Sequence, residues 1–385
     1  MSFAKRARDN YFTLNGRSSA DWGIVASKDN GFDAPERDVS AIEVPGRNGE
    51  LHIDNGRWRN IDVTYNDCVI ERDFTERFGD FRAYCARQRG YQRLEDTFHP
   101  DEYRLADMTQ GIKVSSVGTR YNSGKFDLTF NCKPQRFLKS GEDPILFIAP
   151  TSSAMRLETP TFTYPESGYD IQRIIVSVAS FPASGSVTIT RTLSDSAGIR
   201  QDVEDSITVT DYDAHTFSGP PTYDQWSLTI EAGASSDSLD DIAVEVEYGY
   251  ALINDASVSL AGSVIARKHE IINPTGFKCN PLIQIIGGRL PLSYISDGNE
   301  RWVMAWNLDS SINPDEFFMD CENEYIYYVE DGVRRNLTNY LTITHYDKNG
   351  NEMPLSFPNM GEDTTNLYFS ASPGIVLIYP HWYTI

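Results

Sequence analysis

The histidines and cysteines are the side chains best suited to hold a metal or act as nucleophiles, and their spacing fits neither task. The six histidines are scattered, and no two have the close spacing of zinc ligands. The sequence also contains no Gly-rich phosphate loop, Ser elbow or Cys–His arrangement. We therefore expect no catalytic residue, no metal and no cofactor. The histidines are His52, His99, His215, His269, His345 and His381.

The five cysteines are odd in number and separated by wide, irregular gaps. Such gaps are typical neither of a zinc knuckle nor of a disulfide framework. We therefore expect five free thiols in a protein made in a reducing cytoplasm. They are Cys68, Cys85, Cys132, Cys279 and Cys321.

The 55 acidic residues could include a glycosidase pair, because two carboxylates about 5–10 Å apart suffice for that chemistry. The sequence cannot locate such a pair, and solvated surface is the simpler interpretation. The segment 347–351 (Asp-Lys-Asn-Gly-Asn) has some likeness to a calcium loop. Its Gly stands one place early and the distant Glu is absent, so we expect a plain turn.

Aromatic residues between 160 and 230 offer a different chemistry, because aromatic faces stack on sugar rings. Tyr223 and Phe217 flank the turn at 218–221 and are the candidates for glycan contact. The alternative is that these aromatic rings pack inside a β-sandwich. Trp226 starts an alternating run and is expected in the core.

Charge restricts the function and divides the chain. The net charge is −21, which disfavours nucleic-acid binding because that depends on Lys and Arg neutralising phosphates. Residues 150–260 contain 4 Arg, no Lys and 17 acidic residues, whereas the positive and negative charges of residues 1–137 cancel to a net charge of zero. The acidic block is therefore predicted to fold as a separate unit. Charges near the start argue against a signal peptide, and no run of 18 apolar residues suggests membrane insertion.

One helix is predicted at about 73–89. Asp73 is expected to cap it with Glu76 as the capping-box partner, and Gly90 to end it in a left-handed conformation. An apolar stripe follows helical periodicity through Phe74, Phe78, Phe81 and Cys85.

The other regular segments are predicted to be strands. Period-two alternation recurs through 176–248, with turn clusters between the runs, which is typical of a β-sandwich. We predict a mainly β, multi-domain β-sandwich protein with domains at 1–140, 147–262 and 265–385. Further strand runs are expected at 58–65, 112–117, 126–130, 282–286, 325–329 and 341–344.

Several segments, taken in order, resemble the distal tail protein family of long-tailed, non-contractile phages. The most recognisable is Val-Pro-Gly-Arg-Asn-Gly-Glu-Leu at 44–51. The resemblance covers residues 10–138 and 268–385, while about 120 residues between them are extra relative to short family members. The other matching segments are 90–94, 103–104, 132–137, 273–276, 280–285, 357–361 and 379–382.

The resemblance implies a structural protein rather than an enzyme. The first domain would form a hexameric ring at the virion tail tip, bound to the tail tube protein and to a tail-tip hub or fibre protein. The last domain would be a galectin-like sandwich. The insertion would be an added β domain of the sugar-binding kind that longer family members carry, available to contact host-surface glycan.

Arg47 lies between two expected tight turns, Pro-Gly and Asn-Gly. It is either a solvated turn residue or a residue of the ring interface, where its guanidinium would form two parallel hydrogen bonds to a neighbouring subunit's carboxylate. Two other functions stay open: a carbohydrate-binding adhesin, and a tail-associated glycan hydrolase. Ring formation, sugar affinity and glycan turnover distinguish the three.

Overall fold

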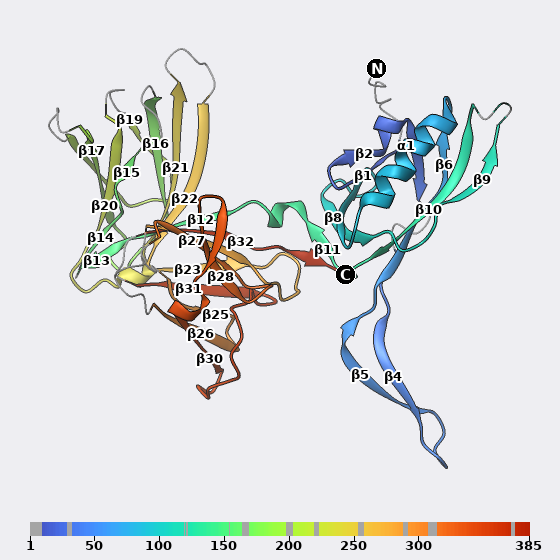
Figure 1. Ribbon diagram of the computed structural model, residues 1–385. Helices are drawn as coiled ribbons and strands as arrows, with labels where there is room; N and C mark the ends of the chain where they lie inside the picture. The colour runs from blue at the N-terminus through green and yellow to red at the C-terminus, as the bar shows by residue number, and fades with distance from the viewer. Residues whose placement is uncertain are drawn as a thin grey trace. The chain divides into compact units, whose positions relative to one another are not determined.

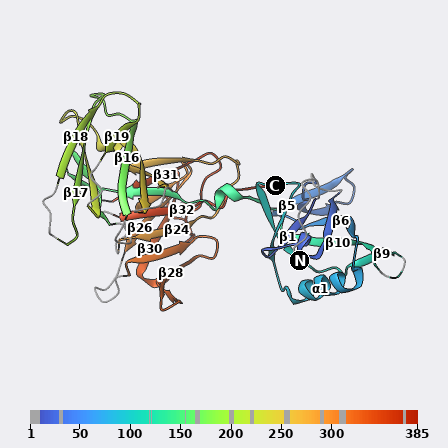
Figure 2. The same ribbon diagram turned by 90° about the horizontal axis from the view of Figure 1, so that it is seen from above.

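A computed structural model describes the chain at residues 10–28, 33–118, 120, 122–153, 155–163, 169–197, 203–218, 223–252, 258–287, 292–306, 314–370 and 374–385. The fold is mainly β, with 56% of residues in strands and 9% helical, as predicted. Two compact units are present (Figures 1 and 2). Unit 1 comprises residues 1–141 and 382–385, and unit 2 comprises residues 142–381.

Unit 1 is built on a twisted sheet in the order β2-β1-β7-β8-β10-β6-β3, with β9 added beside β10. The C-terminal β33 (Tyr383–Thr384) returns to pair with β11 (Arg136–Leu138). The strands are β1 (Phe12–Leu14), β2 (Arg17–Ser18), β3 (Ile24–Lys28), β4 (Arg37–Glu43), β5 (Glu50–Trp58), β6 (Ile61–Ile70), β7 (Gln92–Asp96), β8 (Glu102–Asp107), β9 (Lys113–Val117) and β10 (Gly124–Cys132).

Alternating aromatic residues fix the core of unit 1. Phe126 and Phe130 on β10 point to the side of the sheet that α1 (Phe74–Arg87) covers. Both views show α1 along that one side (Figures 1 and 2). The Phe81 ring centroid of α1 lies 5.9 Å from that of Phe126 and 6.2 Å from that of Phe12. The predicted stripe is therefore confirmed: Phe74, Phe81 and Cys85 are buried, and Phe78 packs against them.

The predicted helix caps are wrong. Asp73 adopts a left-handed conformation (φ 56°) and makes no side-chain cap bond. Its backbone N–H donates instead to Asn122 Oδ1, so the loop at 122 positions the helix start. The helix ends at Arg87 because Gln88 is extended, and Gly90, although at φ 68°, lies beyond this end.

Unit 2 contains three sheets. Ten strands form the largest, in the order β19-β16-β21-β22-β12-β32-β24-β27-β28-β29, and a six-stranded and a five-stranded sheet accompany it. The first half of unit 2 contains β12 (Ile145–Ala149), β13 (Thr151–Ser153), β14 (Arg156–Glu158), β15 (Phe162–Thr163), β16 (Tyr169–Ser180), β17 (Val187–Ser194), β18 (Val203–Val209), β19 (His215–Ser218), β20 (Gln225–Ala232), β21 (Ala243–Leu252) and β22 (Val258–Ala266).

The second half continues the same large sheet and adds the five-stranded sheet β23-β31-β25-β26-β30. Its strands are β23 (Lys268–Ile272), β24 (Leu282–Ile286), β25 (Leu292–Ser296), β26 (Glu300–Trp306), β27 (Glu316–Asp320), β28 (Tyr325–Glu330), β29 (Val333–Asn336), β30 (Leu341–Asp347), β31 (Thr364–Phe369) and β32 (Gly374–Tyr379). The predicted strand runs at 282–286, 325–329 and 341–344 correspond to β24, β28 and the start of β30.

The described residues between 150 and 260 form a two-layer sandwich, as the alternation predicted. In Figure 2, β17 and β18 lie opposite β16 and β19. The two layers share one buried cluster that includes Val176, Ile189 and Trp226. A compact separation of this region from 265–385 is not seen, because β12 bridges them. It pairs in parallel with β22 at Phe147–Val264 and antiparallel with β32 from Ile145 to Ala149.

Candidate functional site

The β4–β5 hairpin, here called the arm, is the most distinctive surface feature of unit 1. It forms a two-stranded sheet of its own and extends away from the main sheet (Figure 1). Its tip contains both predicted tight turns: the Arg47 N–H donates to the Val44 carbonyl at 3.1 Å, and Gly46 and Gly49 have φ of 80° and 84°. The segment singled out in the sequence is therefore the end of a projecting hairpin.

One face of the arm is apolar. Ile42 pairs with Leu51, and Ser40 with Ile53, so these side chains lie on the same side of the hairpin. Ile42, Leu51 and Ile53 are 45%, 42% and 46% exposed. The opposite face contains polar or small residues such as Ala41 and His52. Because a lone hairpin is marginally stable in water, an exposed apolar face of this kind makes the arm a candidate contact surface.

Ion pairs hold the base of the arm. The Asp38 carboxylate accepts from Arg57 Nε at 2.6 Å and from Arg59 Nε and Nη2 at 3.2 and 3.1 Å. These hydrogen bonds, with Arg57 first, hold the pKa of Asp38 below its usual value. Arg37 stacks over the Trp58 ring and pairs with Asp54 at 2.8 Å. The arm is thus fixed at its base and open at its tip.

Arg47 lies exposed at the tip of the arm. Within the described ranges its guanidinium has no ion pair or side-chain hydrogen bond, so both predicted roles remain predictions. The predicted strand runs did not include the arm. Its signal in the sequence is the alternation of Ile42 with Val44 and of Leu51 with Ile53, on either side of the Pro-Gly and Asn-Gly turns.

The predicted glycan contacts are not a surface pair. Phe217 is only 3% exposed, which contradicts its expected exposure. It lies on β19 opposite Ile174, and its ring packs in the sandwich core with the Arg191 guanidinium 5.1 Å away. Tyr223 is half-buried against the same core. Trp226, 1% exposed, is in the core as predicted. The Gly-Pro-Pro residues between Phe217 and Tyr223 lie outside the described residues.

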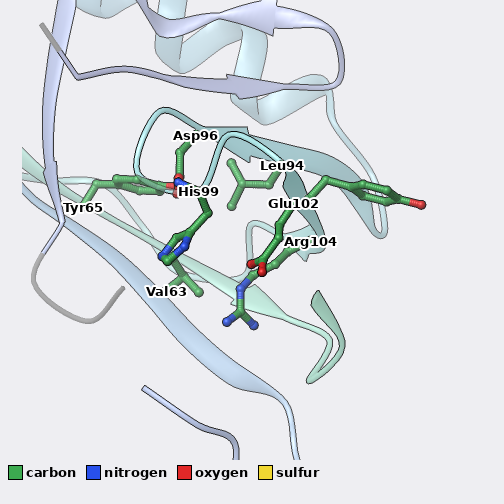
Figure 3. A pocket seen from close by; sticks show the side chains of 8 residues that line it. Val63, Tyr65, Leu94, Asp96, His99, Glu102 and Arg104 are labelled. Atoms are coloured by element: carbon green, nitrogen blue, oxygen red, sulfur yellow. The ribbon is translucent and has the colours of Figure 1, made fainter. Parts of the chain in front are cut away.

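A small pocket in unit 1 gathers two carboxylates, Asp96 and Glu102, as a hydrolase pair would require (Figure 3). Its cavity of about 20 Å³ has room for roughly one water and not for a sugar ring. Asp96 already accepts from the Tyr65 hydroxyl at 2.8 Å and from the Phe98 and His99 N–H groups. Its carboxylate is therefore committed to structure and poorly placed to act on a substrate.

The side chains of Ser356, His345 and Glu300 form a further constellation, which their wide spacing in the sequence does not indicate. Ser356 Oγ lies 3.0 Å from His345 Nδ1, and His345 Nε2 lies 3.6 Å from Glu300. However, Ser356 Oγ also accepts from Trp302 Nε1, and the His345 ring stacks flat on the buried Trp302 ring. These contacts are those of a packed polar cluster.

No group of three potential metal ligands is found among the described residues. The segment 347–351 is a turn, as predicted: the Gly350 N–H donates to the Asp347 carbonyl, and the Asp347 side chain accepts from Asn349 and Asn351. All five cysteines are free, as predicted, and the structure shows that all five are buried. No helix in the described part of the chain is long and apolar enough to cross a membrane.

Comparison with protein-family models finds no match, and comparison with curated protein sequences likewise finds none. The arm is therefore the feature on which a functional proposal rests.

Proposed function

We propose that this chain is a structural subunit of a phage tail tip, a distal tail protein whose unit 1 assembles into a hexameric ring. The observation that carries the proposal is the arm, an anchored hairpin with an apolar face of Ile42, Leu51 and Ile53 exposed to solvent. Burying such a face against a second copy removes apolar area from water. The resemblance of the arm tip to the distal tail family adds the expected ring size and location.

A second exposed surface on unit 1 supports a ring over a two-fold dimer. The strand β9 is exposed along its whole length, and its Val114 and Val117 are 44% and 41% exposed. Two unlike apolar surfaces on one unit suit a head-to-tail contact, which closes into a ring when the rotation allows. In this proposal the arm of one subunit packs on the neighbouring subunit, and Arg47 pairs with a carboxylate there.

The remaining parts of the proposal follow the family resemblance. The ring binds the tail tube protein on one side and a tail-tip hub or fibre protein on the other. Unit 2, including its proposed galectin-like part, is available for contact with the host surface. Phe217 is no longer a candidate for that contact, because its ring is buried. The proposed function requires no catalysis.

Native mass spectrometry and negative-stain microscopy of the purified protein test the ring. We expect a closed oligomer of about six copies, alone or with the tail partners. Replacing Ile42 and Leu51 together with Asp should give monomers. The matched control, Ala41→Asp with His52→Asp, places the same charges on the opposite face at the adjacent pair and should still assemble. A wild-type protein that stays monomeric at high concentration and with its partners would refute the proposal.

A further inference from the structure

A row of cations and tyrosines crosses the outer face of the five-stranded sheet in unit 2. Its members are Lys268 on β23, Tyr368 on β31, Tyr294 on β25, Arg301 on β26 and Tyr346 on β30. The strands follow one another in this order (Figure 1). Their chain neighbours Ile295, Trp302 and Leu367 are buried, so the row lies on the other side of each strand. We call it the cation–tyrosine row.

The row is continuous. The Tyr294 and Tyr368 rings stack with centroids 4.0 Å apart. Lys268 Nζ lies 5.5 Å from the Tyr368 ring, and the Arg301 guanidinium lies 5.8 Å from Tyr294 and 5.2 Å from Tyr346. Because the Tyr294 and Tyr368 rings stack on each other and their hydroxyls share a hydrogen bond, the exposed cations Lys268 and Arg301 are the groups most open to a ligand. Burial, and the hydrogen bond that Tyr294 donates to Tyr368, raise the pKa of Tyr294 to about 12, so this phenol keeps its proton at neutral pH.

The two positive charges of the row, on Lys268 and Arg301, lie in a strongly acidic unit. Residues 142–381 contain 12 Lys and Arg and 34 Asp and Glu, a net charge of −22. Five of these cations form ion pairs with carboxylates: Arg156, Arg191, Arg267, Lys278 and Arg335. Lys268 and Arg301 are exposed and, within the described part of unit 2, face tyrosine rings without a carboxylate partner. Their charge is thus available to an anion.

We propose that the cation–tyrosine row binds an acidic glycan, whose carboxylates pair with Lys268 and Arg301 and whose hydroxyls bond to the tyrosine phenols. Asn366 and Thr344 occupy the same face and add amide and hydroxyl groups suited to sugar hydroxyls. The row spans four interstrand spacings, roughly 19 Å, which suits an extended polymer. The proposal does not depend on ring formation, although several copies in a ring would strengthen binding through avidity.

Two carboxylates lie near the row, Glu270 on the same face of β23 as Lys268 and Asp240 near Tyr294, whereas most of the acidity of unit 2 acts on a polyanion at long range. At physiological ionic strength charges are screened beyond about 8 Å, so the nearest groups decide local binding. Contacts with exposed cations are themselves salt-sensitive. We therefore expect affinity to fall as salt is raised, which stacking on a neutral sugar would not show.

The test uses the full chain and calorimetric titration with oligogalacturonate, an acidic sugar polymer, and with its methyl ester, which has the same backbone without charge. We expect the acid to bind and the ester to bind at least tenfold more weakly. Lys268→Met with Arg301→Met should weaken binding of the acid by roughly tenfold or more, as loss of charge-assisted hydrogen bonds implies. Tyr294→Phe, which keeps the ring stack and removes one hydroxyl, should weaken it less.

Arg334→Met is the matched control, because Arg334 also lies over a tyrosine ring, Tyr327, at 4.5 Å but belongs to the other sheet. It should bind like wild type, and thermal unfolding should show that all variants are folded. Equal binding of acid and ester, an equal loss in Arg334→Met, or no binding by the wild type would each overturn the proposal. Particle mass, measured on the same samples, reports ring formation separately.

Discussion

A buried arginine in the sandwich core of unit 2 forms an ion pair with a partly exposed carboxylate. Arg191 is 1% exposed and makes a two-pronged contact with Asp205, Nε to Oδ1 at 3.0 Å and Nη2 to Oδ2 at 2.6 Å. The Asp205 side chain is 43% exposed, so solvent screens part of the pair. A buried charge is costly without its partner, more than the intact pair is stabilising.

Asp205→Ala should therefore destabilise unit 2 by about 2 kcal/mol, below the usual range for a fully buried pair because of that exposure. Arg191→Met combined with Asp205→Ala should recover most of the loss. Thermal unfolding midpoints measure both. If the double variant is no more stable than Asp205→Ala alone, the Arg191 charge is not what makes the single change costly.

Side chains in alternating strands and in the helix were predictable from the sequence, whereas those beside turns were not. Phe74, Phe81 and Trp226 are buried as their periodicity indicated. Phe217 was misassigned because its proximity to Gly-Pro-Pro suggested a surface loop. The sheet partner decides instead, since β19 pairs with β16 and directs Phe217 inward. The arm's strands were not predicted, because β5 and most of β4 are exposed on both faces and so lack the pattern of a core strand.

The arm as an element is expected to depend on Asp38. This residue is 8% exposed, and its pKa is lowered chiefly by the hydrogen bond from Arg57 and then by that from Arg59. Because the folded-state pKa lies below the unfolded value, the contribution is present above the unfolded value near 3.8. It is lost as the pH falls through the lowered folded-state pKa. The base of the arm should therefore stay ordered from neutral pH down to about pH 4.

Asp38→Asn should loosen the arm at neutral pH, because it removes the charge that both arginines share. Hydrogen exchange of the β4 and β5 amides should become faster. Asp54→Asn is the control within the same hairpin, since Asp54 pairs with Arg37 where both side chains are about half exposed, 51% and 49%. Its effect should be much smaller. Equal exchange in the two variants would mean that the apolar and backbone contacts hold the arm without Asp38.

For the whole chain, the change in charge along the sequence predicted the end of the first domain, but it did not predict that the two later regions share a sheet. The first block, which has no net charge, corresponds closely to the first segment of unit 1, which ends at Gly141. The acidic block and the following residues share one ten-stranded sheet. Net charge reports on surface, whereas the junction depends on β12, five mostly apolar residues whose two pairing partners lie about 120 and 230 positions later in the sequence. Strand pairings between residues so far apart in the sequence cannot be predicted from local sequence patterns.

The same strand determines what happens if the middle region is removed. The two faces of β12 serve different cores: Phe147 contacts Phe369, with ring centroids 6.1 Å apart, whereas Ile148 packs with Ile265 in the sandwich cluster. Deleting residues 150–262 with a short linker therefore leaves β12 paired with β32 but uncovers Ile148 and Ile265, both fully buried in the intact protein. We expect the simple deletion to be poorly soluble.

Adding Ile148→Thr and Ile265→Thr should restore solubility and leave ring formation by unit 1 intact, as measured by sedimentation and particle mass. Phe147→Thr in place of Ile148→Thr should not rescue, because Phe147 belongs to the core that remains. A simple deletion that is as soluble and as stable as its Thr-substituted form would show that the middle region contributes little to the rest of unit 2 and is modular, as the charge pattern first suggested.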